Sequence, residues 1–209
     1  MSFLRLCVLL SAAWCVLTLA LAYAGVKAFG TRQLFARPAG DPARGVAYAF
    51  TKAMLPWAKE SVRTNLLSYA AGMTFHAGVF AAFLLLLLAL SGFYLPWPVA
   101  LPVGSLALVG GIAGLALIVK RLLSPVLRGL SVPDDFISNL LSSGFALLGF
   151  AGIFAPVLQG LWMAWTVLLL LYLPLGKIRH CVFFFTTRYH LGAFFGRRGT
   201  FPPGDGSHA

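Results

Sequence analysis

Runs of about 18 or more consecutive apolar residues recur about five times along this chain and constrain its fold more than any other feature. Each run can cross the hydrocarbon core of a bilayer as an α-helix, in which every backbone hydrogen bond is satisfied internally. The composition agrees, because 60% of the 209 residues are hydrophobic and only 10% are charged, too few to cover the surface of a soluble domain. The sequence therefore predicts an all-α integral membrane protein.

The apolar runs predict five transmembrane helices in one bundle. We place the spans at residues 3–25, 66–91, 99–119, 135–155 and 159–189, within one membrane domain over residues 1–195 that a polar C-terminal tail over 196–209 follows. The last span is unusually long, and Pro174 predicts a kink within it. In the third span, Gly110 and Gly114 have the small-xxx-small spacing that favours close approach of a neighbouring helix.

The distribution of basic residues predicts the orientation of the bundle. Of the sixteen Lys and Arg residues, all except Arg5 lie between the first and second runs, between the third and fourth runs, or at the C-terminal end. These regions are then cytoplasmic, so the N-terminus lies outside and the C-terminus inside. The same flanking charges favour an uncleaved first span over a signal peptide. The net charge of +11 thus reflects topology, and we expect no nucleic-acid partner.

The longest hydrophilic piece, residues 26–63, predicts a short helix at the membrane surface. Asp41 and Pro42 have the residue types of an N-cap and a first helical position, and the helix would run to Leu55, where the next proline stops it. Its mixed apolar and basic side chains are typical either of an anchor in the membrane interface or of a docking site for a cytoplasmic partner. The segment Ser131-Val-Pro-Asp-Asp135 predicts another helix N-terminus, at the fourth span.

Two of the four histidines lie within predicted spans, where an ionisable side chain is costly and by default functional. From the helical rise per residue, His76 lies about 16 Å and His180 about 13 Å from the cytoplasmic ends of their spans. Two imidazoles at one depth on facing helices are suited to ligate one iron axially. His190 falls at the membrane surface and His208 in the tail, so we predict one non-covalently bound haem b, held by His76 and His180.

Basic residues near the cytoplasmic ends of these spans are candidate partners for haem propionates. Lys120 and Arg121 end the third span, and Lys177 lies one helical turn before His180. Partly buried propionates need such cations; the other interpretation is that these side chains extend to lipid headgroups. The three cysteines form no Cys-x-x-Cys pair, which argues against zinc, iron–sulfur ligation and covalently attached haem.

Three segments carry a family resemblance: Phe75-His-Ala-Gly-Val79, Lys120-Arg-Leu-Leu-Ser-Pro125 and Pro174-Leu-Gly-Lys-Ile-Arg-His180. In this order they resemble the gamma subunit of respiratory nitrate reductase, across the second to fifth predicted spans. A fourth segment, Leu55-Pro-Trp-Ala-Lys-Glu60, is closer to the cytochrome b subunits of sulfite-reduction-associated and heterodisulfide-reductase-like membrane complexes. The nitrate reductase members hold two haems, but the positions of the second histidine pair are Leu86 and Trp162 here. The resemblance therefore carries over only one pair of ligands, His76 and His180.

The resemblance implies a multi-pass haem b subunit in a bacterial or archaeal cytoplasmic membrane. Such a subunit passes electrons between menaquinone or menaquinol and cytoplasmic iron–sulfur subunits. It is the electron-transfer part of a multisubunit quinone oxidoreductase, not an enzyme that acts alone on a soluble substrate. The alternative prediction is a haem-free membrane anchor or a transporter in which His76 relays protons. Transporters commonly have internal repeats and broken helices, and the sequence shows neither.

Overall fold

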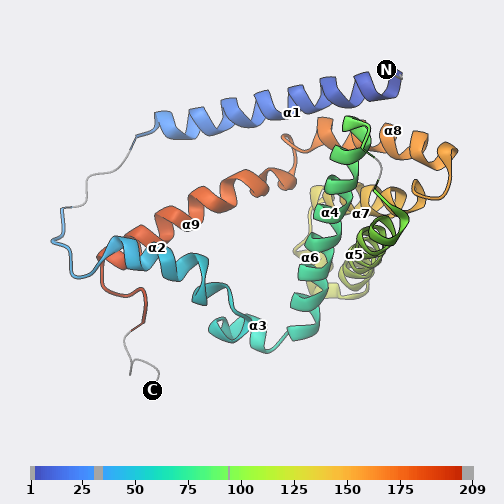
Figure 1. Cartoon of the computed structure of the whole chain (residues 1–209). Helices are drawn as coiled ribbons and strands as arrows, with labels where there is room; N and C mark the ends of the chain where they lie inside the picture. The colour runs from blue at the N-terminus through green and yellow to red at the C-terminus, as the bar shows by residue number, and fades with distance from the viewer. Residues whose placement is uncertain (1–2, 31–34, 94, 204–209) are drawn as a thin grey trace. The chain divides into compact units, whose positions relative to one another are not determined.

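The computed structural model is helical across the residues that it describes, which are 3–30, 35–93 and 95–203 (Figure 1). No strand occurs within these ranges. The chain divides into two compact units, the first formed by Met1–Thr18 with Leu67–Ile178 and the second by Leu19–Leu66 with Arg179–Ala209. His76 therefore belongs to the first unit and His180 to the second.

Three helices are long and apolar enough to cross a membrane: α1 (Phe3–Ala28), α4 (Leu66–Ser91) and α5 (Trp97–Leu123). They cover the first three predicted spans. A fourth span is obtained if α8 (Pro156–Tyr172) and the segment Lys177–Arg197 are counted together as one broken span. The structure thus supports an all-helical fold with three or four membrane-spanning helices, in place of the five predicted.

The fourth and fifth predicted spans account for this difference. Helix α7 (Pro133–Ala151) occupies the fourth, but it is not among the helices apolar enough to span. It begins with two aspartates and carries further polar side chains along its length: Asp134, Asp135, Ser138, Asn139, Ser142 and Ser143. In the fifth, the chain does not continue as one kinked helix. Helix α8 ends at Tyr172, a 3-10 turn η3 (Lys177–Arg179) follows, and α9 (His180–Arg197) completes the chain's helices.

The break after α8 has a local cause. Pro174 has no N–H for the helical ladder, and its ring clashes with the carbonyl four residues earlier. The N–H groups of Leu175 and Gly176 both donate to the Tyr172 carbonyl, at 2.9 and 3.0 Å, which closes a turn. Asp134 then accepts the Lys177 N–H at 2.9 Å. A Cβ on Gly176 would lie 2.4 Å from Tyr172 Cε1 and 2.8 Å from the Asp134 carboxylate, so these side chains would have to move to admit any other residue.

Close helix approaches hold the first unit together. A Cβ on Gly110 of α5 would lie 2.5 Å from the Gly78 Cα of α4, and one on Gly114 would meet side chains of α4 and α7. The close approach predicted from the spacing of these two glycines is therefore confirmed. In the core, Phe145 of α7 is fully buried and contacts Phe83 of α4 and Trp162 of α8, with ring centroids 4.7 and 5.8 Å apart.

The second unit is built on the pairing of α2 (Pro42–Phe50) with α9, which lie side by side in Figure 1. Asp41 caps α2 by accepting the Ala43 N–H at 2.8 Å, which confirms the predicted helix start. The helix ends at Phe50 and not at Leu55. The chain continues in two 3-10 turns, η1 (Lys52–Met54) and η2 (Pro56–Ala58). They are separated at Leu55, which is extended because it precedes a proline.

Two further short helices complete the described elements: α3 (Glu60–Arg63) and α6 (Pro125–Gly129). The α6 segment is capped by the Ser124 hydroxyl, which accepts the Leu127 N–H at 3.4 Å. It connects α5 to α7 and so sets the spacing between the Lys120-Arg121 pair and the aspartates of α7.

Candidate functional site

His76 lies on an exposed face of α4 within the first unit. The neighbouring side chains on this face include Phe80 and Leu87, which are 68% and 64% exposed. The opposite face, which includes Gly78 and Leu85, is buried in the unit. The imidazole is therefore not a core residue of the first unit.

The ring nitrogens of His76 have different roles. Its Nδ1 lies 2.6 Å from the Gly72 carbonyl oxygen, one turn earlier on α4. A carbonyl only accepts hydrogen bonds, so Nδ1 carries a proton and donates it to this oxygen. Metal-ligating histidines typically donate their second ring N–H to a carbonyl or carboxylate, which fixes the tautomer and the ring orientation. The Gly72 contact holds the His76 ring in one orientation on α4.

The second candidate ligand, His180, is the first residue of α9 and is exposed. His190 lies on the same helix, ten residues or about 15 Å of rise farther along. His208 lies outside the described residues. The equal depth of His76 and His180, inferred from the helical rise, stays a prediction.

Two of the three candidate propionate partners are brought together by one carboxylate. Lys177 Nζ lies 2.7 Å and Arg121 Nη1 lies 3.8 Å from Asp135, with 53% and 37% of their side chains exposed. Asp135 itself is only 14% exposed, so the two cations meet at a carboxylate that is largely buried. The third candidate, Lys120, donates to the Ser68 hydroxyl of α4. All three cations belong to the first unit, as does His76.

Asp135 was not identified as a site residue from the sequence. The sequence analysis placed its carboxylate in the first turn of a helix, where it indeed accepts the Val132 N–H at 2.9 Å. That local signal gives no information about Lys177, which is 42 residues away in sequence.

The positions that would hold a second ligand pair are filled by packed apolar side chains. Leu86 and Trp162 are each only 3% exposed. Trp162 stacks on Phe145, with their ring planes 27° apart.

Comparison with known proteins gives no relative. No family model, curated protein or solved structure matches this chain. The resemblance to nitrate reductase gamma subunits thus rests on the sequence segments alone, and a function has to be argued from the site residues.

The candidate site residues are two histidines and a group of cations. Within the described ranges, no group of three or more His, Cys, Asp or Glu side chains could hold a metal ion. A haem iron needs only two protein ligands, and its propionates need cations on the same side. His76, His180, and the cations Arg121 and Lys177 provide these donor types.

Proposed function

We propose that this chain is the haem b membrane subunit of a respiratory oxidoreductase complex, which passes electrons between menaquinone or menaquinol and a cytoplasmic iron–sulfur partner. The observation that carries the proposal is His76. It is an exposed imidazole in the middle of a long apolar helix, and its Nδ1 donates a hydrogen bond to the Gly72 carbonyl, so Nε2 would be the coordinating nitrogen. A polar ring at that position is costly in a bilayer, and iron coordination would offset part of the cost.

His76 and His180 would hold the iron as axial ligands. When bound, haem b supplies one-electron transfer by cycling between its ferrous and ferric states. The protein residues fix the imidazole orientation through the Gly72 carbonyl and offer Arg121, Lys177 and Lys120 to the propionates. Arg121 and Lys177 already share Asp135, so a propionate would enter an existing charged cluster.

The proposed topology has five membrane crossings, with the N-terminus outside and the C-terminus in the cytoplasm. Helix α7 is the fourth crossing and α8 with the following segment is the fifth. In this topology the connection over residues 26–63 is cytoplasmic, where it is available to an iron–sulfur subunit. The proposed location is a bacterial or archaeal cytoplasmic membrane.

One structural feature favours a second candidate, a haem-free anchor or transporter in which His76 relays protons. Broken helices are common in transporters, and the chain between α8 and α9 is broken at Pro174. The break has a local structural cause in the proline and the Asp134 contacts, so it does not require a transport function.

A reduced-minus-oxidised absorption spectrum of the purified protein tests the proposal. We expect b-type bands and, in a pyridine haemochrome assay, one haem per polypeptide. Protein purified with haem supplied in excess but without b-type bands would refute the proposal and leave the proton-relay candidate.

Substitutions identify the ligands. We expect His76→Ala and His180→Ala each to abolish haem binding or leave five-coordinate haem, because both axial positions need an imidazole. His190→Ala is the matched control on α9 and should retain the wild-type Soret band. If His190→Ala loses the band while His180→Ala keeps it, the ligand assignment on α9 is wrong.

A further inference from the structure

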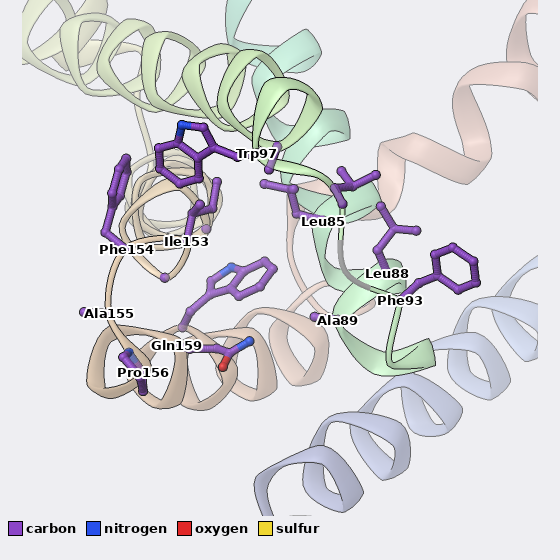
Figure 2. A pocket seen from close by; sticks show the side chains of 15 residues that line it. Leu85, Leu88, Ala89, Phe93, Trp97, Ile153, Phe154, Ala155, Pro156 and Gln159 are labelled. Atoms are coloured by element: carbon purple, nitrogen blue, oxygen red, sulfur yellow. The ribbon is translucent and has the colours of Figure 1, made fainter.

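The two units differ in the kind of ligand that they can hold. The first unit has a cavity of about 320 Å³, which Figure 2 shows beside Leu85, Trp97 and Gln159, and no charged side chain lines it among the described residues. The second unit contains eleven of the sixteen Lys and Arg residues but only three of the five carboxylates. These eleven positive and three negative charges give it a net charge of +8, so the ligand that complements it is an anion.

The second unit is tied to the membrane through the chain itself. Residues 29–65 join the end of α1 to the start of α4, and both helices are long and apolar enough to cross a membrane. This connection therefore begins and ends at a membrane surface, where the phosphate groups of anionic lipids are the nearest anions. Exposed aromatic side chains of the unit suit the same location, because Trp and Tyr are enriched at the level of the headgroups. Trp57 is 67% and Tyr189 is 55% exposed.

Two cations of the second unit are brought together from distant parts of the sequence. Lys59 directly follows η2, and Arg188 lies on α9. The Arg188 guanidinium donates to the Met54 sulfur of η1 and lies over the Phe184 ring, with its Cζ 5.8 Å from the ring centroid. These contacts hold Arg188 against the turns that precede Lys59. Burial and the charge of Arg188 lower the pKa of Lys59, which indicates that the two cations are near enough to repel each other.

The partners that the structure gives Arg188 are neutral. A guanidinium has five N–H donors, and a thioether sulfur is only a weak acceptor. Arg188 forms no ion pair with a described carboxylate. The one carboxylate among the described side chains of this unit, Asp41, accepts the Ala43 N–H at the start of α2. Arg188 therefore has donors left for the oxygens of an anion.

We propose that Arg188 and Lys59 bind the phosphate group of an anionic membrane phospholipid. A guanidinium donates two parallel hydrogen bonds to phosphate oxygens, and an ammonium adds a compact positive charge. A soluble phosphate would satisfy the same two cations but would leave the aromatic side chains of the unit in water. A lipid places Trp57 and Tyr189 in the headgroup region as well. The site belongs to the second unit alone, and it requires neither haem nor a quinone.

Binding is measured by native mass spectrometry on the delipidated full-length protein in a neutral detergent. The probe is phosphatidylglycerol, and phosphatidylcholine is the reference lipid, because it has the same phosphate and acyl chains but no net charge. We expect saturable binding of phosphatidylglycerol that is at least about fivefold tighter than that of phosphatidylcholine. Added salt should reduce this preference, because it screens the charges. Glycerol phosphate, the soluble headgroup, should not displace the lipid at equal concentration.

Substitutions that remove one charge each test the two cations. Arg188→Gln and Lys59→Gln should each weaken phosphatidylglycerol binding about fivefold, as expected for one basic residue at an anionic membrane surface. Arg188→Lys keeps the charge and should retain most of the affinity. Arg128→Gln is the matched control, because Arg128 is exposed in the first unit and its substitution removes the same charge. It should leave the affinity unchanged.

Four results would overturn the proposal. The first is equal affinity for the two lipids in protein whose circular dichroism is that of a folded helical chain. The second is equal weakening by Arg188→Gln and Arg128→Gln, which would show a response to net charge alone. The third is displacement of the lipid by glycerol phosphate at equal concentration, which would make this a site for a soluble anion. The fourth is unchanged lipid binding in Arg188→Gln together with loss of a copurifying acidic protein, which would make the cations a protein-docking site. None of these measurements uses a haem signal, so their outcome is independent of the proposed haem site.

Discussion

The contact between α2 and α9 makes a sharp prediction for Gly192→Ala. A Cβ at this position of α9 would lie 2.7 Å from the Val46 Cα, 2.8 Å from the Gly45 carbonyl oxygen and 3.0 Å from the Ala49 Cβ. The first two atoms belong to the α2 backbone and cannot rotate away. Non-bonded carbon atoms prefer a separation of about 3.5–4.0 Å, so the helices would have to separate by roughly 0.8 Å.

The cost follows from this displacement. Forcing an extra methyl group into a packed contact typically costs about 1–3 kcal/mol. Alanine returns up to about 1 kcal/mol through its higher helix propensity. We therefore expect the second unit to lose about 1–2 kcal/mol, which is a change of roughly 5- to 30-fold in its opening equilibrium.

Hydrogen exchange of α9 amides in the purified full-length protein measures this opening. Exchange of the peptide covering 180–197 should be faster in Gly192→Ala by about the predicted factor. Gly25→Ala is the control, because Gly25 belongs to the same unit and a Cβ there would have no atom within 4 Å. Unchanged exchange in Gly192→Ala, or equal acceleration in the control, would refute the close helix contact.

The remaining predictions concern the first unit and the topology. Gly78→Ala should destabilise the first unit by about 1–3 kcal/mol in thermal unfolding, because its Cβ would lie 2.5 Å from the Gly110 Cα. Gly72→Ala, on the same helix, is the control. It should be neutral, because a Cβ there has no atom within 4 Å. Asp134→Asn should lower the free energy of unfolding by about 1–3 kcal/mol and speed hydrogen exchange over residues 173–179. The reason is that the carboxylate accepts hydrogen bonds from the Tyr172 and Ser138 hydroxyls and from the Lys177 N–H. Exchange at the wild-type rate in this segment would contradict this role. A reporter fused to the C-terminus should be active only if it functions in the cytoplasm, and periplasmic activity would reverse the proposed orientation.

The sequence by itself determined the elements whose signals are local. Three apolar runs became α1, α4 and α5, because length and hydropathy suffice to specify a membrane helix. Asp41 and Pro42 started α2, because capping depends on adjacent residues. The glycine spacing in α5 also predicted a close approach, and Gly110 indeed meets Gly78.

The tertiary structure decided features that join residues far apart in the chain. Pro174 predicted a kink, but the helix is fully broken there. Asp134 accepts the Lys177 N–H and so stabilises the start of η3 after the break. Asp135 became a partner of Lys177 and Arg121, which no local pattern reveals.

The Trp162 side chain shows the same limit in the candidate sites. Its sequence position indicated only that it could not ligate iron. That its N–H is buried without an acceptor depends on how α7 and α8 pack at Gly149. Local sequence sets backbone propensities and helix ends, whereas the partners of a buried polar group depend on long-range packing and become visible only in the folded chain.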